Sequence, residues 1–189
     1  MITSSNNSID TLELFDEGVP SNFVYATMEE IDKEVGGIAD DPHRHNYYTV
    51  IWPVNATGSH LIDFKEYRIE NNAIFFVSPQ QVHQVITGQS PIGHVILFTP
   101  EFLNKNSIKE DFISNLKLFK KADETPPLPV SAEKACRLSL FVNEIAQAYN
   151  SDSPMKLEVI GSYLKLFLIE CNNLCTLPEN YNTQRAEVE

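Results

Sequence analysis

The sequence has little basic charge and no long hydrophobic run. Its 189 residues contain 14 Lys and Arg against 26 Asp and Glu, which gives a net charge of −12. Affinity for DNA or RNA rests largely on basic side chains that displace counterions from phosphates, so the chain lacks the charge of a nucleic-acid-binding domain. An anionic membrane surface would repel it as well. These features favour small molecules or other proteins as partners and exclude direct binding to nucleic acid or membrane.

Cysteines are also scarce and unpaired in the sequence. The three (Cys136, Cys171 and Cys175) form no Cys-x-x-Cys pair, so we expect reduced packing residues and neither a disulfide framework nor a thiolate zinc site. No apolar run approaches the roughly 20 residues of a membrane span. The first ten residues, MITSSNNSID, carry neither the basic nor the apolar region of a secretion signal. We therefore expect a cytoplasmic protein.

Short apolar runs dominate the first half of the chain. From Phe23 to about Thr99 they recur at intervals of about 8–12 residues, separated by turn-forming residues and with no helical period between them. This spacing predicts an antiparallel sandwich or barrel. Short helical pieces are expected between Pro100 and Phe119, followed by an extended segment with prolines at 126, 127 and 129.

The third part of the chain has helical periodicity. Ser131 is a predicted helix cap, and Ser153 followed by Pro154 predicts the start of a second helix. Apolar residues repeat at i, i+3, i+4 and i+7 in both helices. In the second helix the apolar surface is wider than the stripe that one sheet face requires. We expect the surplus to contact either the first helix or a second copy of the chain.

Three histidines fall at spacings typical of a binding site. His43 and His45 are two residues apart in PHRHNYYTVIW, so in a strand they share one face with Tyr47 and Thr49. His83 follows in VSPQQVHQV. If the strands that carry them lie across a barrel from one another, the three imidazoles converge. Neutral imidazole is a common ligand of zinc, iron, copper and nickel.

The longer string from PHRHNYYTVIW to SPQQVHQV resembles the N-terminal effector-binding and dimerisation domain of AraC-family transcriptional regulators, a cupin-like barrel. In that family the pattern runs from His-x-His and an aromatic pair through a strand ending in Ile-Asp to Ser-Pro-x-Gln-Val-His. The similarity extends through FTPEFL and the two helices, over roughly residues 20–175. It implies a mostly β fold with C-terminal helices, namely a cupin-like antiparallel β-barrel (jelly roll) followed by an α-helical pair.

The resemblance also implies a function and a domain organisation. The barrel would bind a small effector, such as a sugar, and the helices would form a homodimer. DNA would be bound only by a C-terminal helix-turn-helix domain that this sequence lacks. The expected segments are an N-terminal arm (1–22), the barrel (23–121), a Pro-rich connector (122–130), the helical dimerisation region (131–176) and a linker toward the DNA-binding domain (177–189).

Specific residues follow from this resemblance. The expected effector-binding residues are His43, His45, Tyr47, Thr49 and His83, with Ile51, Ile62 and Phe76 as candidates for an apolar wall. The expected dimerisation residues are Val159, Tyr163, Leu166, Phe167 and Glu170. No catalytic residue, metal ligand or cofactor is assigned. Of the other singled-out residues, Trp52 is expected in the core, Asp63 in a turn or ladder hydrogen bond, and His60 and His94 at partly exposed strand positions.

The main alternative is a small metal-dependent cupin enzyme, an isomerase or dioxygenase, that uses His43, His45 and His83. Such cupins carry a Glu four or five residues after the second His, where this sequence has Thr49 and Val50. The family's Gly-Asp before the apolar strand is replaced by Asn72–Ala73, and the Gly after the motif's proline by Gln80. The enzyme alternative would therefore have to use a metal site of three imidazoles without a carboxylate ligand. A simple binding barrel without a regulatory role is a third interpretation.

Overall fold

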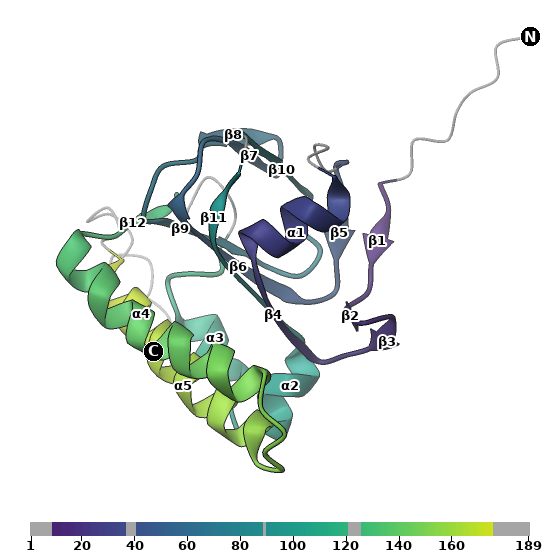
Figure 1. Cartoon of the computed structure of the whole chain (residues 1–189), viewed down its shortest axis with the longest axis vertical. Helices are drawn as coiled ribbons and strands as arrows, with labels where there is room; N and C mark the ends of the chain where they lie inside the picture. The colour runs from purple at the N-terminus through teal and green to yellow at the C-terminus, as the bar shows by residue number, and fades with distance from the viewer. Residues whose placement is uncertain (1–8, 37–40, 89, 121–125, 176–189) are drawn as a thin grey trace, which may run out of the picture.

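The fold is built from β-sheets with the C-terminal pair of helices on one side, as a computed structural model of the chain shows (Figure 1). The structure describes residues 9–36, 41–88, 90–120 and 126–175. The expected linker (177–189) and the start of the expected arm therefore lie outside the described residues. Among the described helices, none is long and apolar enough to cross a membrane.

Two antiparallel sheets form the centre of the molecule. The larger has the strand order β12-β9-β6-β11-β4 and the smaller β10-β7-β8. The strands of the larger sheet are β4 (Phe23–Thr27), β6 (Tyr48–Asn55), β9 (Ala73–Val77), β11 (Ile92–Phe98) and β12 (Leu128–Pro129). Those of the smaller are β7 (Gly58–Ile62), β8 (Lys65–Arg68) and β10 (His83–Thr87). The structure confirms the predicted mostly antiparallel β fold with C-terminal helices. Strand pairing in the described residues gives a jelly-roll-like pair of sheets that is not joined into one closed barrel.

The larger sheet is buried on both faces because it separates two hydrophobic clusters. In β6, Val50 and Trp52 face the helices, whereas Thr49 and Ile51 face the smaller sheet, as alternation in a strand requires. Trp52 is fully buried, which confirms its expected core position. Phe76 lies in the cluster on the helix side, so its expected role in an effector pocket is wrong. Its neighbours Phe75 and Val77 face the smaller sheet instead.

Two antiparallel helices cover the outer face of the larger sheet (Figure 1). They are α4 (Ala132–Tyr149), which Ser131 caps as predicted, and α5 (Lys156–Leu174). Helix α5 begins two residues after Pro154, since residues 154 and 155 form a turn in which Ser153 Oγ accepts from the Met155 amide. The shorter helices α2 (Pro100–Lys105) and α3 (Glu110–Asn115) fall within the range expected for helical pieces.

One helix was not expected from the sequence. Helix α1 (Met28–Val35) follows β4 directly and begins with a capping box, in which the Thr27 hydroxyl accepts from the Glu30 amide and Glu30 accepts from the Thr27 amide. The Thr-x-x-Glu spacing predicts such a start. The short apolar runs on either side favoured a strand interpretation instead. In Figure 1, α1 lies across the end of the sheets near β5 (Arg44–His45).

The arm forms two small separate sheets, and the connector pairs with the larger sheet. In the arm, β1 (Thr11–Leu12) runs parallel to β5, and β2 (Phe15–Asp16) forms a hairpin with β3 (Val19–Pro20). The described part of the connector is extended, as its prolines predict, and it contributes β12 to the edge of the larger sheet. Proline is tolerated at such an edge because its missing N–H is not needed for pairing.

Candidate functional site

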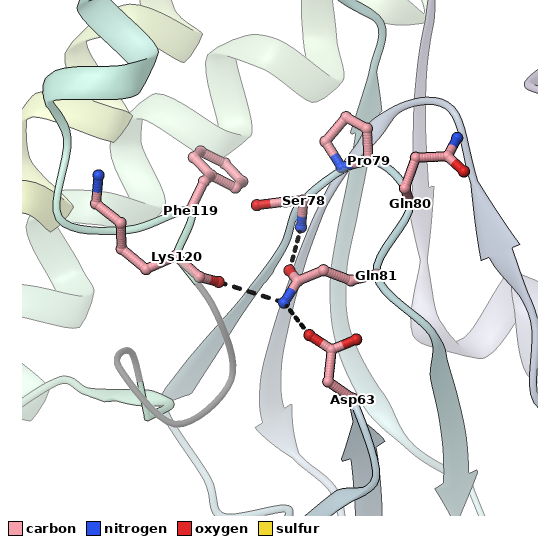
Figure 2. Close-up of a pocket in the computed structure, with 7 residues that line it drawn as sticks. All are labelled: Asp63, Ser78, Pro79, Gln80, Gln81, Phe119 and Lys120. Atoms are coloured by element: carbon pink, nitrogen blue, oxygen red, sulfur yellow. Dashed lines mark hydrogen bonds between the residues drawn. The ribbon is translucent and has the colours of Figure 1, made fainter.

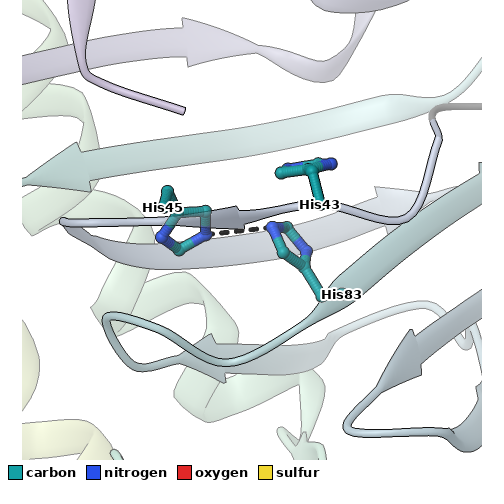
Figure 3. Close-up of side chains that lie close together, drawn as sticks. All are labelled: His43, His45 and His83. Atoms are coloured by element: carbon teal, nitrogen blue, oxygen red, sulfur yellow. Dashed lines mark hydrogen bonds between the residues drawn. The ribbon is translucent and has the colours of Figure 1, made fainter. Parts of the chain in front are cut away.

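The three histidines of the sequence motifs converge in the structure (Figure 3). Their candidate ligand nitrogens all lie within 4.8 Å of one another, and all three side chains are buried. The strands that carry them are neighbours and do not lie across a barrel. His43 and His83 form an antiparallel bridge in which each amide donates to the other's carbonyl, at 3.0 and 2.8 Å. Directly opposed residues in such a bridge place their side chains on the same face.

A fourth histidine belongs to the cluster. His60 is 1% exposed, and its Nε2 lies 3.0 Å from His83 Nδ1. The expectation that His60 is partly exposed is therefore wrong. Strand parity carries the signal that identifies it, because Ile62 is expected to face inward and a residue two positions away in a strand shares its face. His94 is partly exposed, as expected, and bonds to Tyr25 outside this cluster.

The hydrogen bonds fix the tautomers of three imidazoles. His45 Nδ1 lies 2.7 Å from the Tyr47 carbonyl, so it must carry the proton and leave Nε2 as an acceptor. His83 Nε2, at 2.9 Å, donates to that nitrogen, and His83 Nδ1 then accepts from His60 Nε2. All donors in this chain run in one direction, from His60 through His83 and His45 to a backbone carbonyl. The chain begins at His60, whose buried Nδ1 has no partner among the described residues and is left unprotonated.

Burial keeps this chain neutral. Desolvation is the main cause that lowers the pKa of His45 to about 4 and that of His60 to about 3, and neighbouring imidazoles contribute to both shifts. The pKa of His83 is lowered most strongly, first by burial and then by the three imidazoles around it. A second proton on His45 or His83 would also break a hydrogen bond in the chain, because each bond between two rings uses one imidazole lone pair as its acceptor.

The histidines form one end of a cavity of about 410 Å³ between α1 and the inner faces of the two sheets. All five predicted effector-binding residues line it: His43, His45, Tyr47, Thr49 and His83. Tyr47 stacks on His45 with ring centroids 4.2 Å apart, and the Thr49 hydroxyl lies 3.2 Å from His45 Nε2. Aliphatic side chains make up most of the remaining wall: Leu12, Met28, Ile31, Ile51, Val85, Val95 and Leu97. Ile62 lies in the same hydrophobic cluster as Ile51 but does not line the cavity.

The Ile-Asp and Ser-Pro-x-Gln parts of the motif hold the His83 strand in place (Figure 2). The Asp63 carboxylate accepts from Gln81 Nε2 at 2.8 Å and from the Val82 amide at 3.1 Å. The Gln81 side chain also accepts from the Ser78 amide and donates to the Lys120 carbonyl. Asp63 thus makes the turn hydrogen bonds expected of it. These contacts surround a second, open hollow, whose polar groups bond to one another.

A metal ion fits only part of the histidine geometry. The Nδ1 atoms of His43 and His45 face the Asp41 and Tyr47 carbonyls, which is the backing that metal-ligating histidines usually have. His83 is backed by His60, which would have to change tautomer and place a proton on its unpartnered Nδ1. The place of a carboxylate ligand is taken by Thr49. The nitrogens of a tetrahedral zinc site lie about 3.3 Å apart. The candidate nitrogens here lie within 4.8 Å of one another, so the imidazoles would have to move closer together to bind zinc.

The expected dimerisation residues divide into three groups. Val159 and Leu166 are exposed on α5, at 38% and 45%. Tyr163 packs against Phe141 of α4, and Glu170 forms a 2.7 Å salt bridge with Arg137 of the same helix. Phe167 is completely buried beneath α5, near Trp52. It is therefore a core residue of the single chain, and its place in the dimerisation set is corrected.

Comparisons with known proteins give one structural similarity. No protein-family model and no curated protein matches the chain. Among solved structures, the chain is similar to one described as the AraC-like transcriptional activator CuxR, with a TM-score of 0.46 and 14% sequence identity. The similarity covers 71% of this chain and 44% of that chain, so this chain spans less than half the length of that protein. A likeness at this level establishes neither family nor function.

The neutral histidine chain predicts how stability depends on pH. Because the folded pKa values of His45 and His60 lie below the unfolded value of 6.5, these rings gain protons only on unfolding between pH 6.5 and about 4 and 3, respectively. Each is expected to lower the free energy of unfolding by about 1.4 kcal/mol per pH unit in that window. Above pH 6.5 their contribution is constant.

Urea unfolding at a series of pH values from about 7.5 to about 4.5 measures this slope. His60→Gln is expected to reduce the slope by about 1.4 kcal/mol per pH unit, because one titrating ring is removed. Equal slopes for the two proteins between pH 6 and 5 would contradict the assignment of His60 to the buried neutral chain.

Proposed function

We propose that the chain is the sensing and dimerisation domain of an AraC-type transcriptional regulator. The cavity between α1 and the two sheets carries the proposal, because it joins an apolar wall to a small set of converging polar groups. Small-molecule sites usually have this composition, and volumes of about 300–1,000 Å³ are typical of them. The sequence resemblance supplies the regulatory context, a DNA-binding domain whose presentation the bound effector would control.

A hydrogen-bonded route supports communication between the cavity and α5. The Gln80 amide donates to the His45 carbonyl, and the Gln81 side chain donates to the Lys120 carbonyl. Three residues before Lys120, the Lys117 amide donates to Asn172 Oδ1 at 2.7 Å. Asn172 lies in the last turn of α5. A ligand that changes the position of His45 or His83 would therefore act on the segment that packs against the end of this helix.

Regulation would then follow from a shift between two arrangements of a dimer. An effector that binds one arrangement more tightly increases its population by the ratio of the two affinities. A coupling of about 1–3 kcal/mol gives about a 5–150-fold response. The location would be cytoplasmic, where such regulators act on DNA. No cofactor is required by this scheme.

Filling the mouth of the cavity tests the proposed effector site. Ile31 lines the cavity from α1, whereas Lys33 is exposed on the same helix, so Ile31→Trp and Lys33→Trp form a matched pair. A metabolite present at 100 times its Kd adds about 2.7 kcal/mol of stability, or about 5–10 °C in Tm for a chain of this size. A thermal-shift screen of a metabolite library is expected to give hits that Ile31→Trp abolishes and Lys33→Trp retains. Hits that both variants retain would place the binding site elsewhere.

The dimer would form through the outer surface of α4 and α5. Leu140 of α4 is 62% exposed there, and Val159 and Leu166 are the exposed apolar residues of the neighbouring helix α5. Light scattering coupled to size-exclusion chromatography is expected to show a dimer for the parent chain. Val159→Glu with Leu166→Glu is expected to weaken it at least about tenfold, because two charges would enter an apolar contact.

Phe64→Glu is the control for these variants, since Phe64 is an exposed apolar residue at the β7–β8 turn, away from the helices. It is expected to leave the dimer intact. A parent chain that is monomeric at high micromolar concentration, or equal dimer affinities for all variants, would contradict the helix interface.

The second candidate is the metal-dependent cupin enzyme, and the three converging imidazoles are the observation in its favour. His43, His45 and His83 would hold the ion, which would supply Lewis-acid or redox chemistry. Elemental analysis of untagged protein separates the two candidates. The sensor proposal predicts less than one equivalent of metal per chain, and it predicts that the metal content stays the same when His83 is replaced by Gln. One equivalent of metal that this substitution removes would favour the enzyme.

A further inference from the structure

The charges around the cavity point to a particular class of ligand. Asp32 and Glu34 of α1 line it together with the histidine cluster. Among the described residues, no Lys or Arg lines it. The histidine chain adds no positive charge, because its hydrogen bonds require neutral rings. The Asp and Glu side chains that line the cavity in the described residues therefore meet no Lys or Arg there.

The histidine end of the cavity offers no ring N–H group from the hydrogen-bonded chain. The N–H groups of His60, His83 and His45 all donate within that chain or to the Tyr47 carbonyl. The Thr49 hydroxyl lies 3.2 Å from His45 Nε2, whose lone pair already accepts from His83, and the hydroxyl oxygen can accept from a ligand. A ligand group that donates hydrogen bonds is complementary to this end of the cavity.

The wall between these polar groups is aliphatic. A sugar carries hydroxyls on most of its carbons, and those that faced Ile51, Val95 or Leu97 would be buried without partners. Each such group costs about 1–3 kcal/mol. A carboxylate or phosphate ligand would meet no Lys or Arg among the described residues that line the cavity and would be repelled by Asp32 and Glu34.

Resting on the proposed sensing function, we propose that the ligand of this cavity is an apolar organic amine: an aliphatic or aromatic body with one protonated nitrogen. The body would pack against the aliphatic wall. The ammonium group would donate to the acceptor atoms of the cavity and be attracted by Asp32 and Glu34. This ligand class replaces the sugar that the family resemblance suggests.

Three probes of equal shape test the proposal: cyclohexylmethylamine, cyclohexylmethanol and cyclohexanecarboxylate, with glucose as a fourth. Isothermal titration of the full chain near neutral pH is expected to give a Kd for the amine at least about fivefold below that of the alcohol. The carboxylate and glucose are expected to bind more weakly than the alcohol. Higher salt is expected to reduce the preference for the amine, since part of it is electrostatic.

Substitutions connect the preference to the two carboxylates. Asp32→Asn with Glu34→Gln is expected to bring the Kd of the amine to within about twofold of the Kd of the alcohol, both measured on the same variant. Glu66→Gln, an exposed acidic position on β8 that does not line the cavity, is the control and is expected to retain the full preference. Unchanged Tm values without probe confirm that the variants remain folded.

The outcomes separate the ligand class from the proposed function. An amine that binds no tighter than the alcohol, or a failure of all three cyclohexyl probes to bind, would overturn the proposed class. Tighter binding of the carboxylate or glucose, abolished by Ile31→Trp, would overturn the amine but leave the cavity as the effector site. If in addition no metabolite in the library screen depends on the cavity, the sensing function fails as well.

Discussion

The site depends on one constraint, the burial of three imidazoles, those of His45, His60 and His83, that must remain neutral. An imidazole buried as a cation without a counter-charge is costly, and no carboxylate accepts from these rings among the described residues. The molecule meets the constraint by arranging the rings as a directional chain of hydrogen bonds that ends on the Tyr47 carbonyl. Each bond between two rings uses an imidazole lone pair as its acceptor, so a second proton on His45 or His83 would break a hydrogen bond of the chain. The N–H groups of these three rings are therefore used within the chain and are not offered to a ligand in the cavity.

The two-faced central sheet explains how this cavity is kept apart from the helices. Side chains on one face of β6, β9 and β11 pack under α4 and α5, and those on the other face enclose the cavity with the smaller sheet. The cavity and the helix surface are therefore separated by a single layer of strands. The hydrogen bonds that link the cavity to α5 run around this sheet. They pass through the turn at Gln81 and the segment from Lys117 to Lys120.

Local patterns in the sequence predict much of this arrangement. Period-two alternation placed His43, His45, Tyr47 and Thr49 on one face, and the structure confirms that they line one cavity with His83. Helical periodicity located α4 and α5, although α5 starts slightly later because the Pro154 turn precedes it. Asp63 was expected in a turn, and its carboxylate organises the turn that leads to His83.

Other features depend on tertiary context that a local pattern does not contain. The buried position of His60 follows from strand parity only once Ile62 is known to face inward. Phe167 satisfied the requirements for both a core and an interface residue, and its position relative to the sheet decides between them. The capping box of α1 was readable at Thr27 and Glu30, but the short helix that it starts contributes to the cavity through the packing of Ile31 on the sheets.

The protonation state of His45, His60 and His83 is the central claim, and nitrogen-15 NMR of histidine-labelled protein near neutral pH measures it ring by ring. Each ring gives two nitrogen shifts that distinguish the two neutral tautomers and the imidazolium. We predict the Nδ1–H tautomer for His45, the Nε2–H tautomer for His60 and His83, and no imidazolium among these three rings. Protonation of both nitrogens of His83 or His60 at neutral pH would contradict this claim.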